Sequence, residues 1–139
     1  MSAKIITDDQ ERIGRWLHER IEGVYSPNLG SYIGLEKNGE IIAATGYEDF
    51  TGTSVRTHIA VERRITKEFL RFIFWYPFEQ LKVKKLIGLV SGGNEKALKL
   101  DKNMGFIEEA VVKDVYPNGD LHILTMTKEQ CRFLTIGKP

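Results

Sequence analysis

A histidine on a predicted strand is the first side chain in this chain that could transfer a proton. Residues 54–61 alternate apolar and polar side chains, as in a half-buried strand, and place Arg56, His58 and Ala60 on one face. The ordinary pKa of histidine is about 6.5, so His58 could act as a general base near neutral pH. A hydrogen-bonded structural histidine fits the same pattern, and both interpretations stay open.

Basic residues gather where a helix is expected to begin. Arg63, Arg64 and Lys67 surround Thr66, which can cap the helix, and backbone amides near Ile65 would point outward. Free amides, the helix dipole and positive charge together favour an anion such as phosphate. A solvated turn with a simple cap would have the same sequence.

Metal and thiol chemistry are not expected. Cys131 is the one cysteine, which excludes an intramolecular disulfide and suggests a small apolar residue. The three histidines, His18, His58 and His122, share no ligand spacing with it, so no metal site is predicted.

Composition describes an ordinary globular protein. The 139 residues suit a single domain spanning 1–139, with 42% hydrophobic and 28% charged residues. Twenty basic residues against 19 acidic ones give a net charge of +1, so no overall field favours nucleic acid or a membrane surface. No apolar stretch is long enough for a signal peptide or a bilayer span, and we expect a cytoplasmic protein.

Periodicity and turn signals predict helices and strands in one order along the chain. Asn38-Gly39 and residues 117–120 predict two hairpin turns, Pro77 should interrupt or end a helix, and Gly105 should stop another. The expected helices cover 8–21, 66–76 and 94–103, with a last turn within 127–134; the expected strands cover 31–37, 40–47, 54–61, 83–90, 106–115 and 121–127. The strand–helix–strand crossover in the middle requires a parallel pair, so we predict an α/β fold with a mixed sheet.

The segment from Asn94 to Phe106 resembles the late helix of the GCN5-related N-acetyltransferases. That helix often has the pattern Asn-x-x-Ala-x-x-Leu, ending in Gly-Phe, and here Asn94, Ala97, Leu100, Gly105 and Phe106 match it. The order of elements is similar over most of the chain. Residues 76–81 and 120–134 look most like small members encoded by phages and prophages.

The resemblance implies a central mixed sheet of about six or seven strands that splays between residues 54–61 and 83–90. It implies that acetyl-coenzyme A binds in this cleft and that an amine acceptor attacks the thioester directly. An unpaired strand edge there could hydrogen-bond the pantetheine chain. The amine itself stays open, from small molecules to protein lysines, and the loops at 22–30 and 50–53 would shape its side of the cleft.

The resemblance also assigns roles to single residues. His58 would be the base, Glu62 the next candidate, and a backbone amide near Ile59–Val61 the oxyanion donor. Cofactor contacts are expected from the following residues: Ile59, Ala60, Val61, Arg63, Arg64, Ile65, Thr66, Lys67, Asn94 and Lys99.

Two departures from the family pattern leave a second hypothesis open. The phosphate turn at residues 60–67 contains no glycine, and Asp101 stands where the family has its acid, a tyrosine. An ordinary aspartate is ionised at pH 7 and cannot donate a proton unless its environment shifts its pKa strongly. Tyr116 or water could serve instead, or the thiolate could leave unprotonated. The alternative is a catalytically degenerate binding module that acts through a protein partner. A homodimer through the strongly apolar helix at 69–76 is a further prediction.

Overall fold

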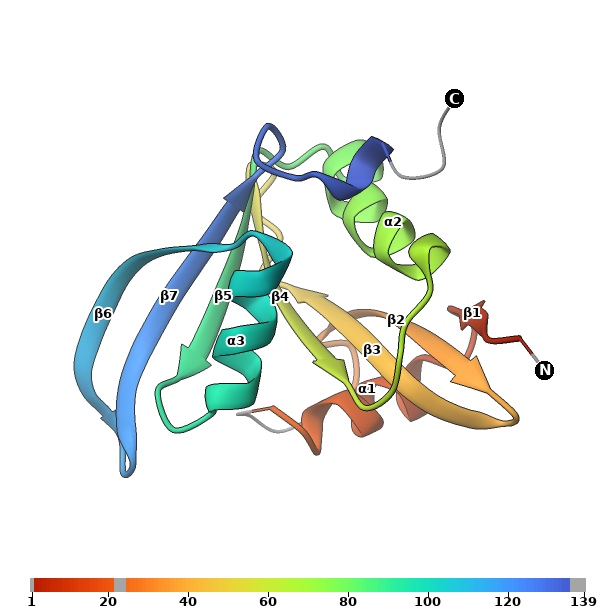
Figure 1. Ribbon diagram of the computed structural model, residues 1–139, viewed down its shortest axis with the longest axis horizontal. Coiled ribbons are helices and arrows are strands. Elements are labelled where there is room, and N and C mark those ends of the chain that lie inside the picture. The colour runs from red at the N-terminus through yellow and green to blue at the C-terminus, as the bar shows by residue number, and fades with distance from the viewer. Residues whose placement is uncertain (1, 22–24, 136–139) are drawn as a thin grey trace.

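The computed structural model describes residues 2–21 and 25–135 and contains a seven-stranded sheet with helices on both faces (Figure 1). Residues 22–24 of the predicted loop at 22–30 lie outside the described residues. The strands run in the order β1-β2-β3-β4-β5-β7-β6. Their bounds are Lys4–Ile6 (β1), Gly30–Lys37 (β2), Glu40–Glu48 (β3), Ser54–Val61 (β4), Lys85–Ser91 (β5), Ile107–Tyr116 (β6) and Gly119–Thr127 (β7). The helices are α1 (Gln10–His18), α2 (Lys67–Trp75) and α3 (Glu95–Met104), with a π-helical turn at Tyr76–Gln80 and a 3-10 turn at Phe133–Thr135.

The sheet is mixed, as predicted, and its one parallel pair is short. Strands β4 and β5 pair only where Ser54–Arg56 lies against Lys85–Ile87. Beyond these residues the two strands diverge, while β4 stays paired with β3, and β5 with β7. The predicted splay between the two strands is therefore present, and one edge of each strand faces the gap without a strand partner.

The predicted turn signals are confirmed where they require unusual backbone conformations. Asn38 and Gly39 both have positive φ, 54° and 81°, as a tight hairpin of the primed type requires. Gly105 ends α3 with a φ of 111°, which a residue with a Cβ rarely adopts. Sequence reasoning missed β1, because three residues paired only with β2 are too few for a recognisable pattern.

Helices cover both faces of the sheet. Helix α1 packs on one face of β2–β4 through Ile13 and Leu17. Helices α2 and α3 lie on the other face, where Phe69, Ile73 and Phe74 are buried in the main core. The apolar character of 69–76 therefore has a core explanation, although Trp75 stays 37% exposed. The homodimer through this helix remains a prediction.

Pro77 interrupts the α-helix without ending the helical path. The α-helix ends at Trp75, and the chain continues as a π-helical turn in which the Leu81 amide donates to the Tyr76 carbonyl. Proline has no N–H, so the carbonyl of Ile73, four residues earlier, loses its usual donor. The buried hydroxyl of Tyr47 on β3 donates to that carbonyl instead.

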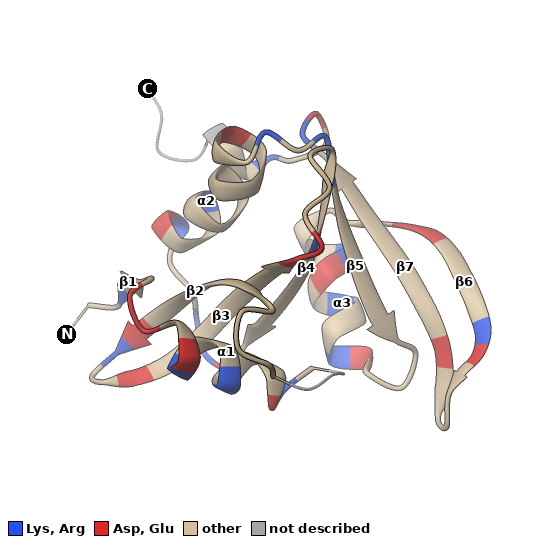
Figure 2. Ribbon diagram, turned by 180° about the vertical axis from the view of Figure 1, so that it is seen from behind, with Lys and Arg blue, Asp and Glu red and all other residues tan. Residues whose placement is uncertain are grey.

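The β6–β7 hairpin extends beyond the helices. Figure 2 shows the face of β5, β7 and β6 opposite α3 without a helix over it among the described residues. Residues Ile107–Val115 of β6 are all exposed, including Ile107, Val111, Val112 and Val115. At its turn the hairpin touches the β5–α3 connection, where a Cβ on Gly119 would lie 3.0 Å from the Gly93 nitrogen.

Tyr47→Phe tests the replacement of the missing proline donor. Loss of the hydroxyl leaves the Ile73 carbonyl buried and unpaired, so we expect the free energy of unfolding to fall by about 1–3 kcal/mol in urea titrations. Tyr76→Phe is the matched control, because its hydroxyl bonds only the half-buried Ser31 side chain. Equal losses in the two variants would contradict this explanation.

Candidate active site

A cleft lies where β4 and β5 diverge, and it contains the ionisable residues that could do chemistry. A narrow hollow of about 20 Å³ is lined by His58 from β4, Leu89 and Ser91 from β5, and Asn94 and Asp101 from the α3 segment. A second hollow of about 170 Å³ shares Ile59, Asn94 and Ala97 with the first. The two form one path from His58 and Asp101 to the end of β4, lined further by Ala60, Val61 and Glu62.

His58 is held by a buried carboxylate. Its Nε2 lies 2.8 Å from Oε1 of Glu48, and the two side chains are 11% and 2% exposed. Glu48 ends β3 and faces Arg56 across the β3–β4 register, two pairs from the pair that contains His58. The ring is therefore hydrogen-bonded, as expected of a structural histidine, and it also lines the cleft. Its role as the base stays a prediction.

Glu48 is a charged residue with an incomplete set of partners. Burial alone would raise its pKa, but the hydrogen bonds and charges of His58 and Arg56 outweigh burial and hold the pKa below its ordinary value. Its Oε1 also accepts from the Arg56 guanidinium at 3.1 Å, whereas Oε2 is buried with no hydrogen-bond partner. The ionised carboxylate fixes the orientation of the imidazole, as a carboxylate behind a catalytic histidine does.

Sequence reasoning missed Glu48. The signal was present in the alternation of β3, because Ala44, Gly46 and Glu48 share one face and Gly46 pairs with His58. The register across the five-residue connection at 49–53 was needed to use it, and the sequence does not fix that register.

Asp101 enters the cleft from the opposite side. It is 7% exposed, and its carboxyl group has no hydrogen bond or ion pair within the described part of the chain. Burial raises its pKa to about 7. Gly88 lies beside it, and a Cβ there would be in ordinary van der Waals contact with Oδ2, at 3.5 Å. This is the strong shift by the environment that the sequence left as the condition for Asp101 to donate a proton.

Asn94 is a helix cap whose amide group is also turned to the cleft. Its Oδ1 accepts from the Ala97 amide at 3.1 Å and so caps α3. Asn94 lines both parts of the cleft, and its Nδ2 makes no hydrogen bond within the described chain. The cap therefore leaves a donor available for a ligand.

Glu62 lies at the mouth of the cleft, and two cations occupy its carboxylate. Arg20 lies 3.3 Å and Lys96 3.5 Å from its oxygens. Burial alone would raise its pKa, but the two cations lower it below its ordinary value. A carboxylate held in this way is a weaker proton acceptor than an ordinary glutamate.

The predicted phosphate turn forms without glycine. Residues 62–66 all avoid positive φ, and Thr66 caps α2 by accepting from the Phe69 amide at 3.1 Å. The amides of Lys67 and Glu68 precede the first helical hydrogen bond, although the Glu68 carboxylate lies in the same turn. Arg63 pairs with Glu40 at 2.8 Å.

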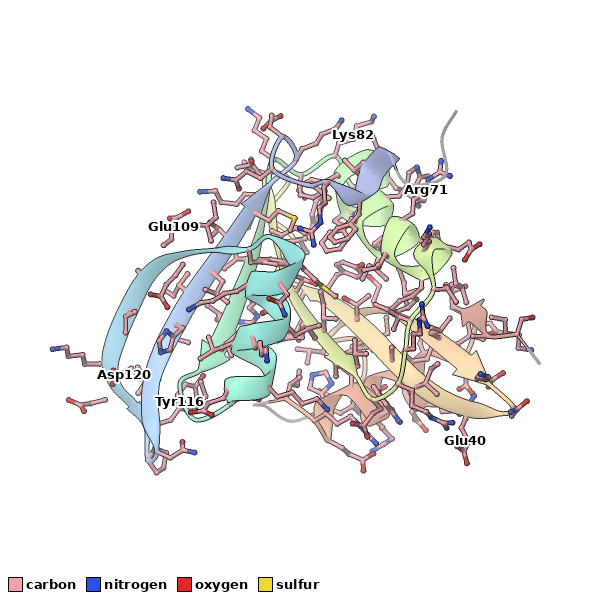
Figure 3. All side chains as sticks on the ribbon, viewed as in Figure 1. Glu40, Arg71, Lys82, Glu109, Tyr116 and Asp120 are labelled. Carbon is pink, nitrogen blue, oxygen red and sulfur yellow. The ribbon has the colours of Figure 1, made fainter. Side chains whose placement is uncertain are left out.

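The other predicted contacts fall into two groups. Arg64 and Lys67 are exposed and make no ion pair within the described residues, and Ile65 is half-buried beside them. Lys99 is exposed on α3, and Tyr116 lies at the hairpin turn of β6–β7 (Figure 3). Neither Lys99 nor Tyr116 belongs to the described residues that line the cleft.

Comparison with known proteins identifies the fold. No family model and no curated protein matches the sequence. Among solved structures, the chain is similar to spermidine N-acetyltransferase from Vibrio cholerae in complex with CoA and spermine. The identity is 14% and the TM-score 0.71, over 92% of this chain and 96% of the other. This is the N-acetyltransferase fold.

A second solved structure has the same fold. A protein described as a probable acetyltransferase is 19% identical, with a TM-score of 0.61, over 73% of this chain and 63% of its own. The prediction of a GCN5-related N-acetyltransferase fold is confirmed. Within the described residues, no helix of this fold has the length and apolar character needed to cross a bilayer.

The buried carboxylate can be tested through its pH dependence. Because folding lowers the Glu48 pKa, its contribution is present above its ordinary pKa of about 4.5 and is lost as the pH falls further. We expect Glu48→Gln to lose about 2–3 kcal/mol at pH 7, since it leaves Arg56 partly buried without this partner. Unfolding curves of wild type and variant should converge at low pH.

The control for that experiment is Asp49→Asn. Asp49 also pairs with Arg56, at 3.0 Å, but its side chain is 66% exposed. An exposed pair contributes about 0–1 kcal/mol. A loss as large as that of Glu48→Gln would mean that burial of the carboxylate is not the reason for its effect.

Proposed function

We propose that this protein is an acetyl-coenzyme A-dependent N-acetyltransferase that moves an acetyl group to an amine. The observation that supports it most is the pairing of His58 with a buried carboxylate inside the split of an N-acetyltransferase-fold sheet. A histidine held in this way can remove a proton from an amine, which is the assistance that direct acetyl transfer most needs.

The cleft suits the elongated pantetheine arm of coenzyme A. Beyond Arg56 and Ile87 the facing edges of β4 and β5 have no strand partner, so their amides and carbonyls can bond an extended chain. Nδ2 of Asn94 adds a donor on the α3 side. The second hollow is lined as far along the chain as Glu62. The start of α2 follows five residues later, where free amides, Arg64 and Lys67 would favour the pyrophosphate.

His58 would accept the proton of the attacking amine. With Nε2–H donated to Glu48, the lone pair of Nδ1 is the basic site. As the amine nitrogen bonds the acetyl carbon, its proton passes to Nδ1 and the carbon–sulfur bond breaks with its electron pair going to sulfur. A backbone amide of residues 59–61 would steady the oxyanion. His58 then returns the proton to solvent.

The acceptor would approach from the α1 side of the sheet, because His58 and Glu48 lie on that face. The similar structure from Vibrio cholerae holds spermine. Here Glu48 is already paired with Arg56 and His58, and Asp101 is the one carboxylate among the described residues that line the hollow beside His58. This charge does not single out a polycation, and we propose an amine acceptor without narrowing it to polyamines.

The role of His58 can be separated from that of Glu62 by substitution. We expect His58→Gln to lower kcat on the order of 100-fold and to remove the acidic limb of the pH–rate profile. Glu62→Gln should leave that limb in place, because Arg20 and Lys96 already hold this carboxylate ionised. Loss of the limb in Glu62→Gln alone would move the base to Glu62.

Two adjacent arginines provide a matched test of the phosphate site. Arg64→Ala should weaken coenzyme A about fivefold in calorimetry, or about 1 kcal/mol. Arg63→Ala should have a smaller effect, because Glu40 already binds its guanidinium. Unchanged affinity in both variants and in Lys67→Ala would place the pyrophosphate elsewhere.

A further inference from the structure

We infer that Asp101 is the acid of the reaction and delivers its proton to the departing sulfur. The inference rests on the proposed function, since it assumes a thioester in the cleft. It assigns the step to a residue whose type, taken from the sequence alone, argues against it.

The position of Asp101 supports this role. Its side chain lines the same space as His58 but belongs to α3, on the opposite face of the sheet. An acceptor entering beside α1 and a thioester lying in the split would leave the amine on the side of His58 and the sulfur towards α3. Base and acid then act from opposite sides of the reacting carbon.

The surroundings of Asp101 supply no partner that would keep it ionised. β5 presents Gly88 and Ser91, β4 presents Thr57 and His58, and α3 itself presents Ala97. His58 is the one other ionisable group among the described residues lining this space, and its Nε2 is bound to Glu48. The carboxyl group is buried without a hydrogen bond, which disfavours its charged form.

The energetics allow the transfer. With a pKa raised to about 7, roughly half of Asp101 is protonated at neutral pH. A thiol has an ordinary pKa near 8.5, so transfer from this acid to a thiolate is downhill. The Asp101 O–H bond breaks and an S–H bond forms, leaving free coenzyme A, and Asp101 regains a proton from solvent. His58 passes one proton from the amine to solvent and Asp101 takes one proton from solvent, so the protons of the overall reaction balance.

The first test concerns the proton and needs no substrate. Because folding raises the Asp101 pKa, the folded state binds more protons than the unfolded state between about pH 4 and 7, and stability falls as the pH rises through this range. Asp101→Asn removes this dependence. We expect the melting temperature of the variant, relative to that of wild type, to rise by several degrees from pH 5 to pH 8.

The second test concerns contact with the sulfur. Ionised Asp101 would place a charge beside the thiol, so coenzyme A should bind wild type about fivefold more weakly at pH 8.5 than at pH 6, beyond any change in Asp101→Asn. The variant also serves as control for titration of the ligand phosphates. Desulfo-coenzyme A, which lacks the sulfur, should show a smaller difference between the two proteins.

The third test is the rate. With an amine that wild type acetylates, chosen from spermine, an aminoglycoside and a peptide with a free amino terminus, Asp101→Asn should lose at least tenfold in kcat at pH 6.5. It should also lose the decline in rate that wild type shows above pH 7. Asp101→Glu should recover part of both effects.

The outcomes separate this inference from the proposed function. Suppose that wild type is active and that Asp101→Asn changes neither the pH profile nor the affinity for coenzyme A. This result would overturn the role of Asp101 and leave the proposed acetyltransferase function in place. A wild type that binds no coenzyme A at either pH would overturn the proposed function and this inference with it. A melting temperature gap that does not change with pH would show that Asp101 carries no proton at pH 7.

Discussion

The site depends on one constraint, the brevity of the parallel contact between β4 and β5. Three residue pairs join the strands, and their divergence beyond Arg56 and Ile87 opens the sheet from inside. The hydrogen bonds that further pairing would supply stay unmade, so backbone groups point into a cleft walled by helix and sheet. The chemistry of the site follows from which side chains reach that cleft from its two faces.

Two carboxyl groups in this fold illustrate how neighbours decide the charge of a buried acid. Glu48 and Asp101 are both almost fully buried. Glu48 meets an imidazole and a guanidinium, which lower its pKa, whereas Asp101 meets a glycine, hydroxyls and apolar groups, and burial raises its pKa to about 7. One acid can therefore orient a base while the other serves as a proton donor, within the same small cleft.

Sequence patterns predicted most of the fold because its signals are local. Asn38-Gly39 fixes a hairpin through positive φ at both residues, and Asn94 with Gly105 marks both ends of α3. The alternation of β4 likewise placed His58 correctly on the face shared with Ala60. These features depend on a few adjacent residues, so no knowledge of the tertiary structure was needed.

What the sequence could not supply are quantities set by distant residues. Glu48 reaches His58 only through the β3–β4 register, and the proton on Asp101 reflects burial by β4 and β5. Arg63 was expected at an anion, and Glu40 at the start of β3, 23 residues earlier, binds it beside the end of β4. Electrostatic roles depend on such neighbours, and residue type alone could not give the pKa of Asp101.

The contact of Gly119 with two other glycines limits how this sequence can change. Gly119 at the hairpin turn lies against Gly92 and Gly93, in the connection that leads to Asn94, and the nearest atoms are backbone atoms that cannot rotate away. A single methyl group at Gly119 would push this connection and thereby the cap of α3. Gly119 should thus tolerate substitution poorly, although it carries no functional group and lies remote in sequence from the base.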